Sequence, residues 1–183
     1  MNAFSLGCRV ALCSLLLSTS AAFSHLATPE LATPVRHAGP LPPALLTAKR
    51  IFISNDGADG GLFPHPFSGD SDRGYDQFYA GVQALGRFQS VADPSQADLV
   101  LELRLTAPYG PTNANKQNGA ADPLPTFRLT IYDRRSHYVL WSLTESIEVA
   151  MKQTTHDRNF DEAVQRLVAG FDALTMPQSP PTR

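Results

Sequence analysis

The sequence predicts an α+β fold of order β-α-β-β-β-β-α, in which two helices pack on a mostly antiparallel mixed sheet. Two kinds of pattern predict it. Three segments alternate apolar and polar side chains with the period of two that a half-buried strand requires, and a fourth is a short, almost continuously apolar run. Two further segments carry apolar residues at helical spacing, one after the first strand and one at the end of the fold.

The first strand is expected at 50–54, where the apolar run is typical of a central strand covered on both faces. It ends at the glycine-rich sequence NDGADGG. After a long loop, residues 75–85 carry aromatic and aliphatic side chains at helical spacing, which predicts the first helix. Ser71 or Asp72 is placed to cap this helix, and Gly86 is placed to end it.

The remaining strands follow closely. Residues 88–91 are expected as a short strand, and the Asp-Pro-Ser sequence at 93–95 as a single helical turn with Asp as its cap. Residues 99–105, 127–132 and 138–150 alternate apolar and polar side chains, which predicts three strands with one face on the core. A tight charged turn joins the last two strands, so these form a hairpin.

That hairpin holds the chain's one tryptophan, Trp141, which is expected to face the core. Glu145 lies in register with the same core-facing series, which is unusual for a charged side chain. Two explanations stay open for it. Either the strand bulges or leaves the covered region there, or the carboxyl group is buried and its pKa is raised.

The last helix is expected in NFDEAVQRLVAGFDAL, with Asn159 as its cap and Glu162 three residues later. These elements define a single α+β domain over residues 48–175. Prolines before and after the domain predict a proline-rich linker at 25–47 and a disordered tail at 176–183. The last helix places six apolar side chains on one face: Phe160, Val164, Leu167, Val168, Phe171 and Leu174.

Residues 1–24 have the layout of a secretory signal peptide, because Arg9 precedes a short apolar run and small residues follow it. Cleavage after either Ala22 or Ser24 fits the small-residue rule. The apolar run is shorter than the roughly 20 residues that span a bilayer. We therefore expect a periplasmic or secreted protein without a stable membrane anchor.

Composition excludes several classes of chemistry. Cys8 and Cys13 are the only cysteines and both lie in the signal peptide, so the mature chain has no thiol for a disulfide, a metal thiolate or nucleophilic catalysis. Without Arg9, the mature chain has 14 Lys and Arg against 17 Asp and Glu. A mildly acidic chain without a basic cluster is not expected to bind nucleic acid.

The order of motifs also carries a resemblance. AKRIFISNDG, a Tyr-rich helix, DPSQADLVLEL, LTIYDRRSHYVLWSLTE and RNFDEAVQRLV together resemble small secreted bacterial proteins of unknown function. More distantly, they are similar to the amino-terminal domain of the Tol-system periplasmic protein and related envelope lipoproteins. The likeness covers residues 48–175 and its motifs are structural. It implies an envelope domain and no catalytic residue.

Topology predicts where a site would lie. If 50–54 and 99–105 are parallel neighbours, loops 55–73, 106–126 and 151–158 emerge at one edge of the sheet. The opposite end, with its Arg-Arg turn, is expected to be inert. Carboxylates dominate the predicted edge, which favours a cation or a basic partner. The predicted contact residues are Asp56, Asp59, His65, Asp70, Asp72, Asn113, Lys116 and His156.

Taken together, the sequence favours a non-enzymatic secreted or periplasmic binding domain, with no cofactor and no metal, for an unknown envelope protein or small ligand. DSDRGYD lacks the Gly and the acid that an EF-hand requires at its sixth and twelfth positions. NDGADGG lacks the Lys-Ser/Thr of a P-loop, and no Gly-x-Ser-x-Gly elbow is present. The alternative is a metal-assisted hydrolase that uses His65, His156 and nearby Asp residues.

Overall fold

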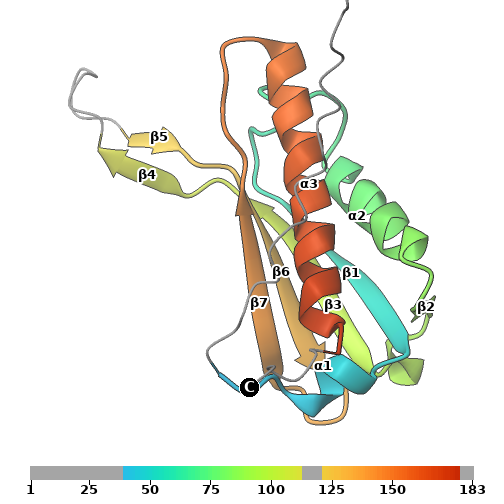
Figure 1. The fold of residues 1–183 in the computed structure, drawn as a ribbon. Helices are drawn as coiled ribbons and strands as arrows, with labels where there is room; N and C mark the ends of the chain where they lie inside the picture. The colour runs from blue at the N-terminus through green and yellow to red at the C-terminus, as the bar shows by residue number, and fades with distance from the viewer. Residues whose placement is uncertain (1–38, 113–120, 178–183) are drawn as a thin grey trace, which may run out of the picture. The chain divides into compact units, whose positions relative to one another are not determined.

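The computed structural model describes residues 39–112 and 121–177. Within these residues, helices cover one face of a five-stranded mixed sheet of order β2-β1-β3-β6-β7 (Figure 1). The predicted α+β class is confirmed. The elements in chain order are α1 (Pro43–Thr47), β1 (Arg50–Ala58), α2 (Arg73–Ala84), β2 (Gln89–Ser90), the 3₁₀ turn η1 (Pro94–Gln96), β3 (Leu99–Thr106), β4 (Tyr109–Thr112), β5 (Ala121–Pro123), β6 (Thr126–Asp133), β7 (Val139–Ser146) and α3 (Gln153–Thr175).

The sheet has a parallel half and an antiparallel half. β1 pairs in parallel with both β2 and β3, whereas β3-β6 and β6-β7 are antiparallel. The parallel pairing of β1 with β3 and the β6-β7 hairpin were both expected from the sequence. Because β1 and β3 run in the same direction, their carboxyl ends lie at one edge of the sheet.

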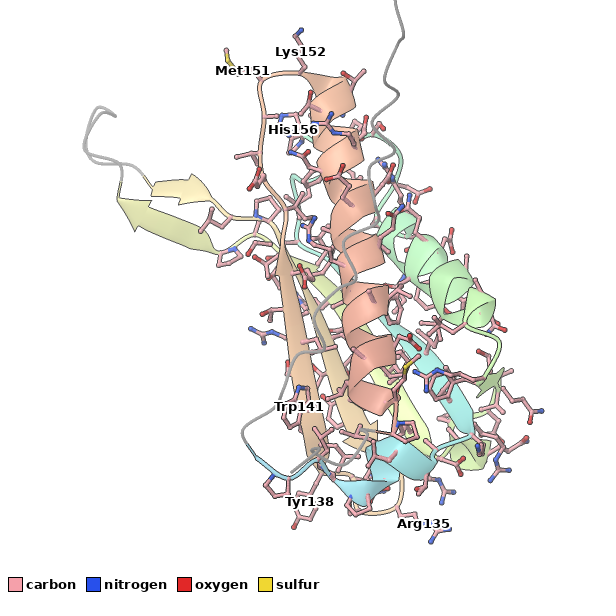
Figure 2. The ribbon with its side chains drawn as sticks, viewed as in Figure 1. Arg135, Tyr138, Trp141, Met151, Lys152 and His156 are labelled. Atoms are coloured by element: carbon pink, nitrogen blue, oxygen red, sulfur yellow. The ribbon has the colours of Figure 1, made fainter. Side chains whose placement is uncertain are left out.

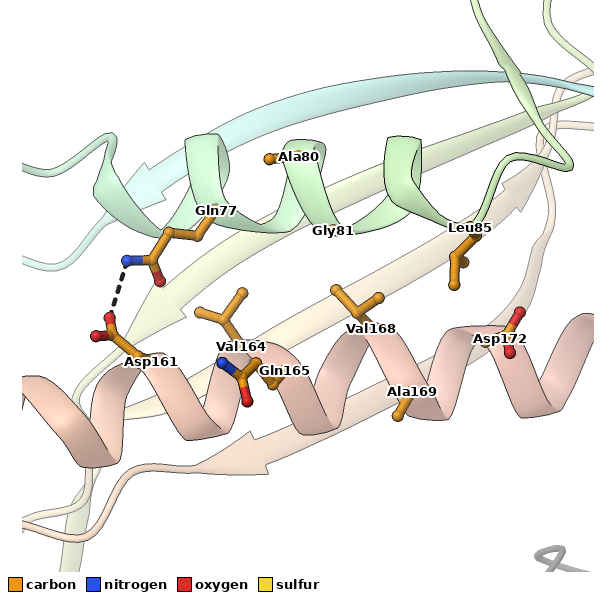
Figure 3. A pocket seen from close by; sticks show the side chains of 10 residues that line it. All are labelled: Gln77, Ala80, Gly81, Leu85, Asp161, Val164, Gln165, Val168, Ala169 and Asp172. Carbon is orange, nitrogen blue, oxygen red and sulfur yellow. Dashed lines mark hydrogen bonds between the residues drawn. The ribbon is translucent and has the colours of Figure 1, made fainter. Parts of the chain in front are cut away.

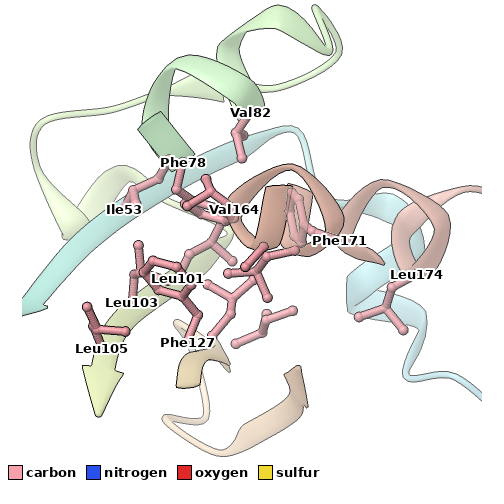
Figure 4. Close-up of a cluster of buried hydrophobic side chains, with 14 of the residues drawn as sticks. Ile53, Phe78, Val82, Leu101, Leu103, Leu105, Phe127, Val164, Phe171 and Leu174 are labelled. Carbon is pink, nitrogen blue, oxygen red and sulfur yellow. The ribbon is translucent and has the colours of Figure 1, made fainter. Parts of the chain in front are cut away.

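The core lies between the sheet and the helices (Figure 4). In β3, every second side chain is buried, so the predicted period of two is confirmed. Two glycines let elements approach closely: a Cβ on Gly74 would lie 2.7 Å from a ring carbon of Phe127, and one on Gly81 would lie 2.8 Å from Val168 Cγ2. The largest fully buried side chains are Phe67, Phe78, Phe127, Phe160 and Phe171.

The first and the last helix of the chain both differ from the prediction. The segment 25–47 is expected to be an extended linker, yet its last residues form α1, in which Leu45 is buried. Asn159 is not the cap of α3, because α3 begins six residues earlier, at Gln153. Four of the six residues in the added turns, Thr154, Thr155, His156 and Asp157, are weak helix formers, and contacts to distant parts of the chain hold these turns in place.

The long loop predicted at 106–126 also contains regular structure. β4 and β5 pair as an antiparallel ribbon outside the main sheet, and Leu124 N–H donates to Pro108 O at its base (2.8 Å). The predicted contacts Asn113 and Lys116 lie outside the described residues, as does the tail from residue 178.

Trp141 and Glu145 occupy the edge strand β7. Both lie on the helix-facing side, opposite Ile131 and Phe127 of β6, but at the edge they are only half-buried. Glu145 Oε2 lies 3.1 Å from Arg166 Nε of α3. Glu145 therefore lies on the core-facing side of its strand, as the alternation predicts. An ion pair with α3, which neither explanation from the sequence included, accommodates its charge there.

Candidate functional site

The loop end is the edge of the sheet where residues 55–72, 106–108, 124–126 and 147–158 meet. One carboxylate joins the first two of these segments. Asp59 N–H donates to Leu105 O (2.9 Å), and Asp59 Oδ2 accepts from Ala107 N–H (2.9 Å). The bond from Ala107 is the main reason that the pKa of Asp59 lies below its ordinary value, although partial burial opposes it.

Arg104 neutralises two of the predicted site residues. Its guanidinium group lies 3.0 Å from Asp59 Oδ1 and 3.2 Å from Asp56 Oδ2. Because Arg104 is on β3 and both carboxylates belong to the end of β1 and its following loop, these pairs fix that loop against the sheet. Neither carboxylate is left without a cationic partner.

A second arginine joins the two long helices. Arg73, in the first turn of α2, lies 2.7 Å from Asp157 Oδ1 and 2.6 Å from Asp161 Oδ1 of α3. Its guanidinium carbon also stacks 4.5 Å from the ring centre of buried Phe160. Asp157 Oδ1 in turn accepts from Ser68 N–H (2.9 Å), which ties the loop before α2 to the same cluster.

The contacts of this cluster lower the pKa of Asp157. Burial alone would raise the pKa of this carboxyl group. The hydrogen bonds from Arg73 and from Ser68 outweigh burial, and they hold the pKa of Asp157 well below its ordinary value of 3.8. Asp157 is therefore a charged structural group.

The loop between β7 and α3 is tied down at three points. Ile147 N–H donates to Pro125 O (2.8 Å), Asn159 Nδ2 donates to Glu148 O (2.9 Å), and Ala150 N–H donates to His156 Nδ1 (3.2 Å). His156, one of the predicted contact residues, thus accepts a hydrogen bond that holds this loop.

Apolar side chains project from the same loop. Met151 is fully exposed and Val149 is 45% exposed, and Figure 2 shows Met151 and Lys152 at its tip. We call Val149 and Met151 the apolar tip.

The other predicted residues lie at the loop end too. His65 Nδ1 is 3.2 Å from Gln153 Oε1 in the first turn of α3, so His65 and His156 share one end of the sheet. Asp72 Oδ1 accepts from Asn55 Nδ2 (2.9 Å), and Asp70 Oδ1 accepts from Asp72 N–H (3.0 Å). Each of the predicted carboxylates among the described residues thus accepts a hydrogen bond from another part of the fold or from its own loop.

Sequence reasoning missed Arg73, Arg104 and Asp157, which organise the loop end. The carboxylates that pair with these arginines lie 45 to 88 residues away in the chain, and no local motif marks such a pair. Among residues 39–112 and 121–177, no group of three or more His, Cys, Asp and Glu side chains is placed to hold a metal ion. None of the helices within those ranges is long and apolar enough to cross a membrane. The hydrolase alternative stays a prediction.

A groove of about 600 Å³ runs between α2 and α3 (Figure 3). Gly81 and Val168 lie along it, and Gln77 Nε2 donates to Asp161 Oδ1 across it (2.8 Å). Because Asp161 also pairs with Arg73, this end of the groove belongs to the cluster of Arg73, Asp157 and Asp161. Small residues of both helices are among those that line it: Ala80, Gly81 and Ala169.

No protein-family model matches the sequence. No curated protein matches it either. Among solved structures, the chain is similar to a DUF4136 family protein from Bacteroides thetaiotaomicron, with 12% identity, a TM-score of 0.48, and coverage of 72% of this chain and 91% of that one. It is similar to the PelC dodecamer from Paraburkholderia phytofirmans, with 11% identity, a TM-score of 0.41, and coverage of 77% and 96%.

A third similar structure is lipoprotein GNA1162 from Neisseria meningitidis, with 14% identity, a TM-score of 0.35, and coverage of 68% of this chain and 98% of that one. The solved structures that the chain is similar to thus include a DUF family protein and a lipoprotein. The more specific relation to the Tol-system domain stays a prediction.

Proposed function

We propose that this protein is a non-enzymatic binding domain of the cell envelope, periplasmic or secreted, that docks a protein partner on its loop end. The observation that carries the proposal is the apolar tip, where exposed Val149 and Met151 sit on a loop held by hydrogen bonds at both of its ends. The signal-peptide pattern of residues 1–24 supports export.

The rigidity beneath the tip supports a docking role. Binding costs less conformational entropy when the contact surface is already ordered. Ile147 is buried, and its N–H donates to Pro125 O. The side-chain amide of Asn159 donates to the carbonyl oxygen of Glu148. The loop can therefore present its apolar side chains to a partner without first folding.

Charge at the loop end supports a basic partner. The exposed carboxylates Asp70, Asp72 and Glu148 of this end form no ion pair with any described cationic side chain, and Lys152 is a cation beside the tip (Figure 2). A partner with a basic rim around an apolar centre complements this surface. Such a rim would speed association and make it weaker at high salt.

Affinity capture from a detergent extract of the source envelope tests the proposal. The mature chain is immobilised beside a variant that carries Val149→Asp and Met151→Asp. We expect the unaltered chain to retain a discrete protein that this variant loses, since two charges cannot enter an apolar contact.

Tyr138→Asp is the matched control, because Tyr138 is 75% exposed at the opposite end of the sheet. It should retain the same protein. Retention by the Val149→Asp, Met151→Asp variant equal to that of the unaltered chain would contradict docking at the apolar tip, as would the absence of any specifically retained protein.

A further inference from the structure

A pocket of about 690 Å³ lies at the opposite end of the molecule, on the sheet face that the helices leave open. We call this region the turn end. Its volume lies within the range of small-molecule sites. One wall is η1, a second is the β6-β7 turn, and a third is the face of β3 and β6. The pocket is lined by Pro94, Ser95, Val100, Glu102, Tyr132, Asp133, Arg134, Arg135 and His137.

The two arginines of this pocket differ from most arginines of the fold. Neither Arg134 nor Arg135 has a carboxylate oxygen within 4.0 Å among the described residues. Six others have such an oxygen at 3.7 Å or less: Arg50, Arg73, Arg87, Arg104, Arg158 and Arg166.

The acidic groups near these arginines are already engaged. Asp133 accepts from Ser136 Oγ and from the N–H groups of Ser136 and Arg135. Asp93 accepts from Ser95 N–H (2.8 Å). The hydrogen bonds from Ser95 are the main reason that the pKa of Asp93 lies below its ordinary value. The positive charge of Arg134 contributes least to this lowering. Both guanidinium groups therefore keep donors available.

The wall on the sheet has a different character. Tyr132 O–H donates to Glu102 Oε1 (3.2 Å), and Val100 adds an apolar surface beside them. A carboxylate still has acceptor capacity after one hydrogen bond. This wall suits an apolar body that ends in a hydroxyl group, whereas the arginines suit an anionic group.

We propose that this pocket binds a small organic anion, with its carboxylate or phosphate group on Arg134 and Arg135 and a hydroxylated apolar body against Val100, Tyr132 and Glu102. Arginine presents paired donors that match both kinds of anion. The site goes beyond partner docking at the loop end and does not depend on it. It also departs from the sequence-based expectation that the Arg-Arg end is inert.

NMR titration of the ¹⁵N-labelled mature chain tests this site with four probes: benzoate, phenyl phosphate, 4-hydroxybenzoate and the cation benzylamine. We expect the anions to move the amide signals of Ser95, Val100 and residues 132–137 at millimolar concentrations, and benzylamine to leave them in place. A stronger response to benzoate or to phenyl phosphate identifies a carboxylate or a phosphate as the preferred group. If 4-hydroxybenzoate binds more tightly than benzoate, the hydroxyl contact at Glu102 is supported; equal or weaker binding overturns that part of the proposal.

The arginines are tested by Arg134→Gln with Arg135→Gln, which should weaken anion binding by about tenfold or more. The matched control, Arg128→Gln with Arg158→Gln, also removes two positive charges but lies outside the pocket, and it should bind within about twofold of the unaltered chain. The spectra of each variant report whether it folds.

Three results would overturn the site: no shift of the pocket amides with any anion, equal shifts with benzylamine, or unchanged anion binding in a folded Arg134→Gln, Arg135→Gln variant. The comparison of benzoate with benzylamine uses the unaltered chain. It therefore decides the matter even if the variant does not fold.

Discussion

The loop end and the turn end use their charged residues in opposite ways. At the loop end, Arg73 and Arg104 each pair with two carboxylates and connect segments that are far apart in the chain. At the turn end, Arg134 and Arg135 line an open pocket without such partners among the described residues. Charge at an edge of the sheet therefore does not identify a binding site. What matters is whether the fold already uses that charge.

The largest effect that separates the two ends is expected for Arg73→Met. This change removes two ion pairs and leaves Asp157, whose side chain is only 23% exposed, without its cation. We expect the free energy of unfolding in urea to fall by about 2–3 kcal/mol, somewhat less than for a fully buried pair.

Arg158→Met provides the control for Arg73. Arg158 pairs with Glu162 one turn away on the exposed face of α3, and such a pair contributes about 0.5 kcal/mol or less. Equal losses in the two variants would contradict a structural role for the Arg73 cluster.

A somewhat smaller loss of stability is expected when acid protonates Asp157. Because the folded pKa of Asp157 lies below its ordinary value, its charged form stabilises the fold. That contribution is complete above the unfolded pKa of about 4 and is lost as pH falls toward the folded value.

Asp157→Asn should therefore lower stability by about 1–2 kcal/mol at pH 7 and by less near pH 3. Urea denaturation at both values measures the difference. A stability loss that is the same at both would show that the charge of Asp157 does not contribute.

Arg104→Met should have a smaller effect still, because its side chain and those of Asp56 and Asp59 are between 37% and 43% exposed. We expect a loss of about 0.5–1 kcal/mol in urea denaturation. High salt should reduce the difference from the unaltered chain, since it screens exposed pairs. A difference that is unaffected by salt would mean that the packing of Arg104, and not its charge, stabilises the loop.

The smallest effect is expected at the turn end. Arg134→Gln with Arg135→Gln removes no ion pair with a described residue, so the free energy of unfolding should change by less than about 0.5 kcal/mol. Thermal and urea denaturation check this. A loss as large as that of Arg73→Met would remove the contrast between the ends.

Much of the fold could be predicted because its strands carry local patterns. The alternation in 99–105 and 127–132 reports one buried face directly, and the order of elements placed β1 beside β3. α1 could not be predicted, because a five-residue helix after prolines has no periodicity and depends on the burial of Leu45. The start of α3 was missed for a related reason, since distant contacts to Gln153 and Asp157 stabilise its first turns.

The gathering of the predicted residues at one end of the sheet could be predicted, but their contacts could not. Topology put His65 and His156 at one end of the sheet, and the contact between His65 and Gln153 agrees with this. The pairing of Arg104 with Asp56 and Asp59 could not be predicted, because it depends on the bulge in β1 after Asn55. The exposure of Met151 is likewise a property of the folded loop.

Site-specific photo-crosslinking in the native envelope tests the contrast between the ends most directly. A benzophenone amino acid replaces Met151 in one variant and Tyr138 in another, two side chains that are both strongly exposed and lie at opposite ends of the sheet (Figure 2). Docking at the loop end predicts a discrete protein adduct from position 151 and none from position 138. An adduct from position 138 alone, or equal adducts from both positions, would contradict it.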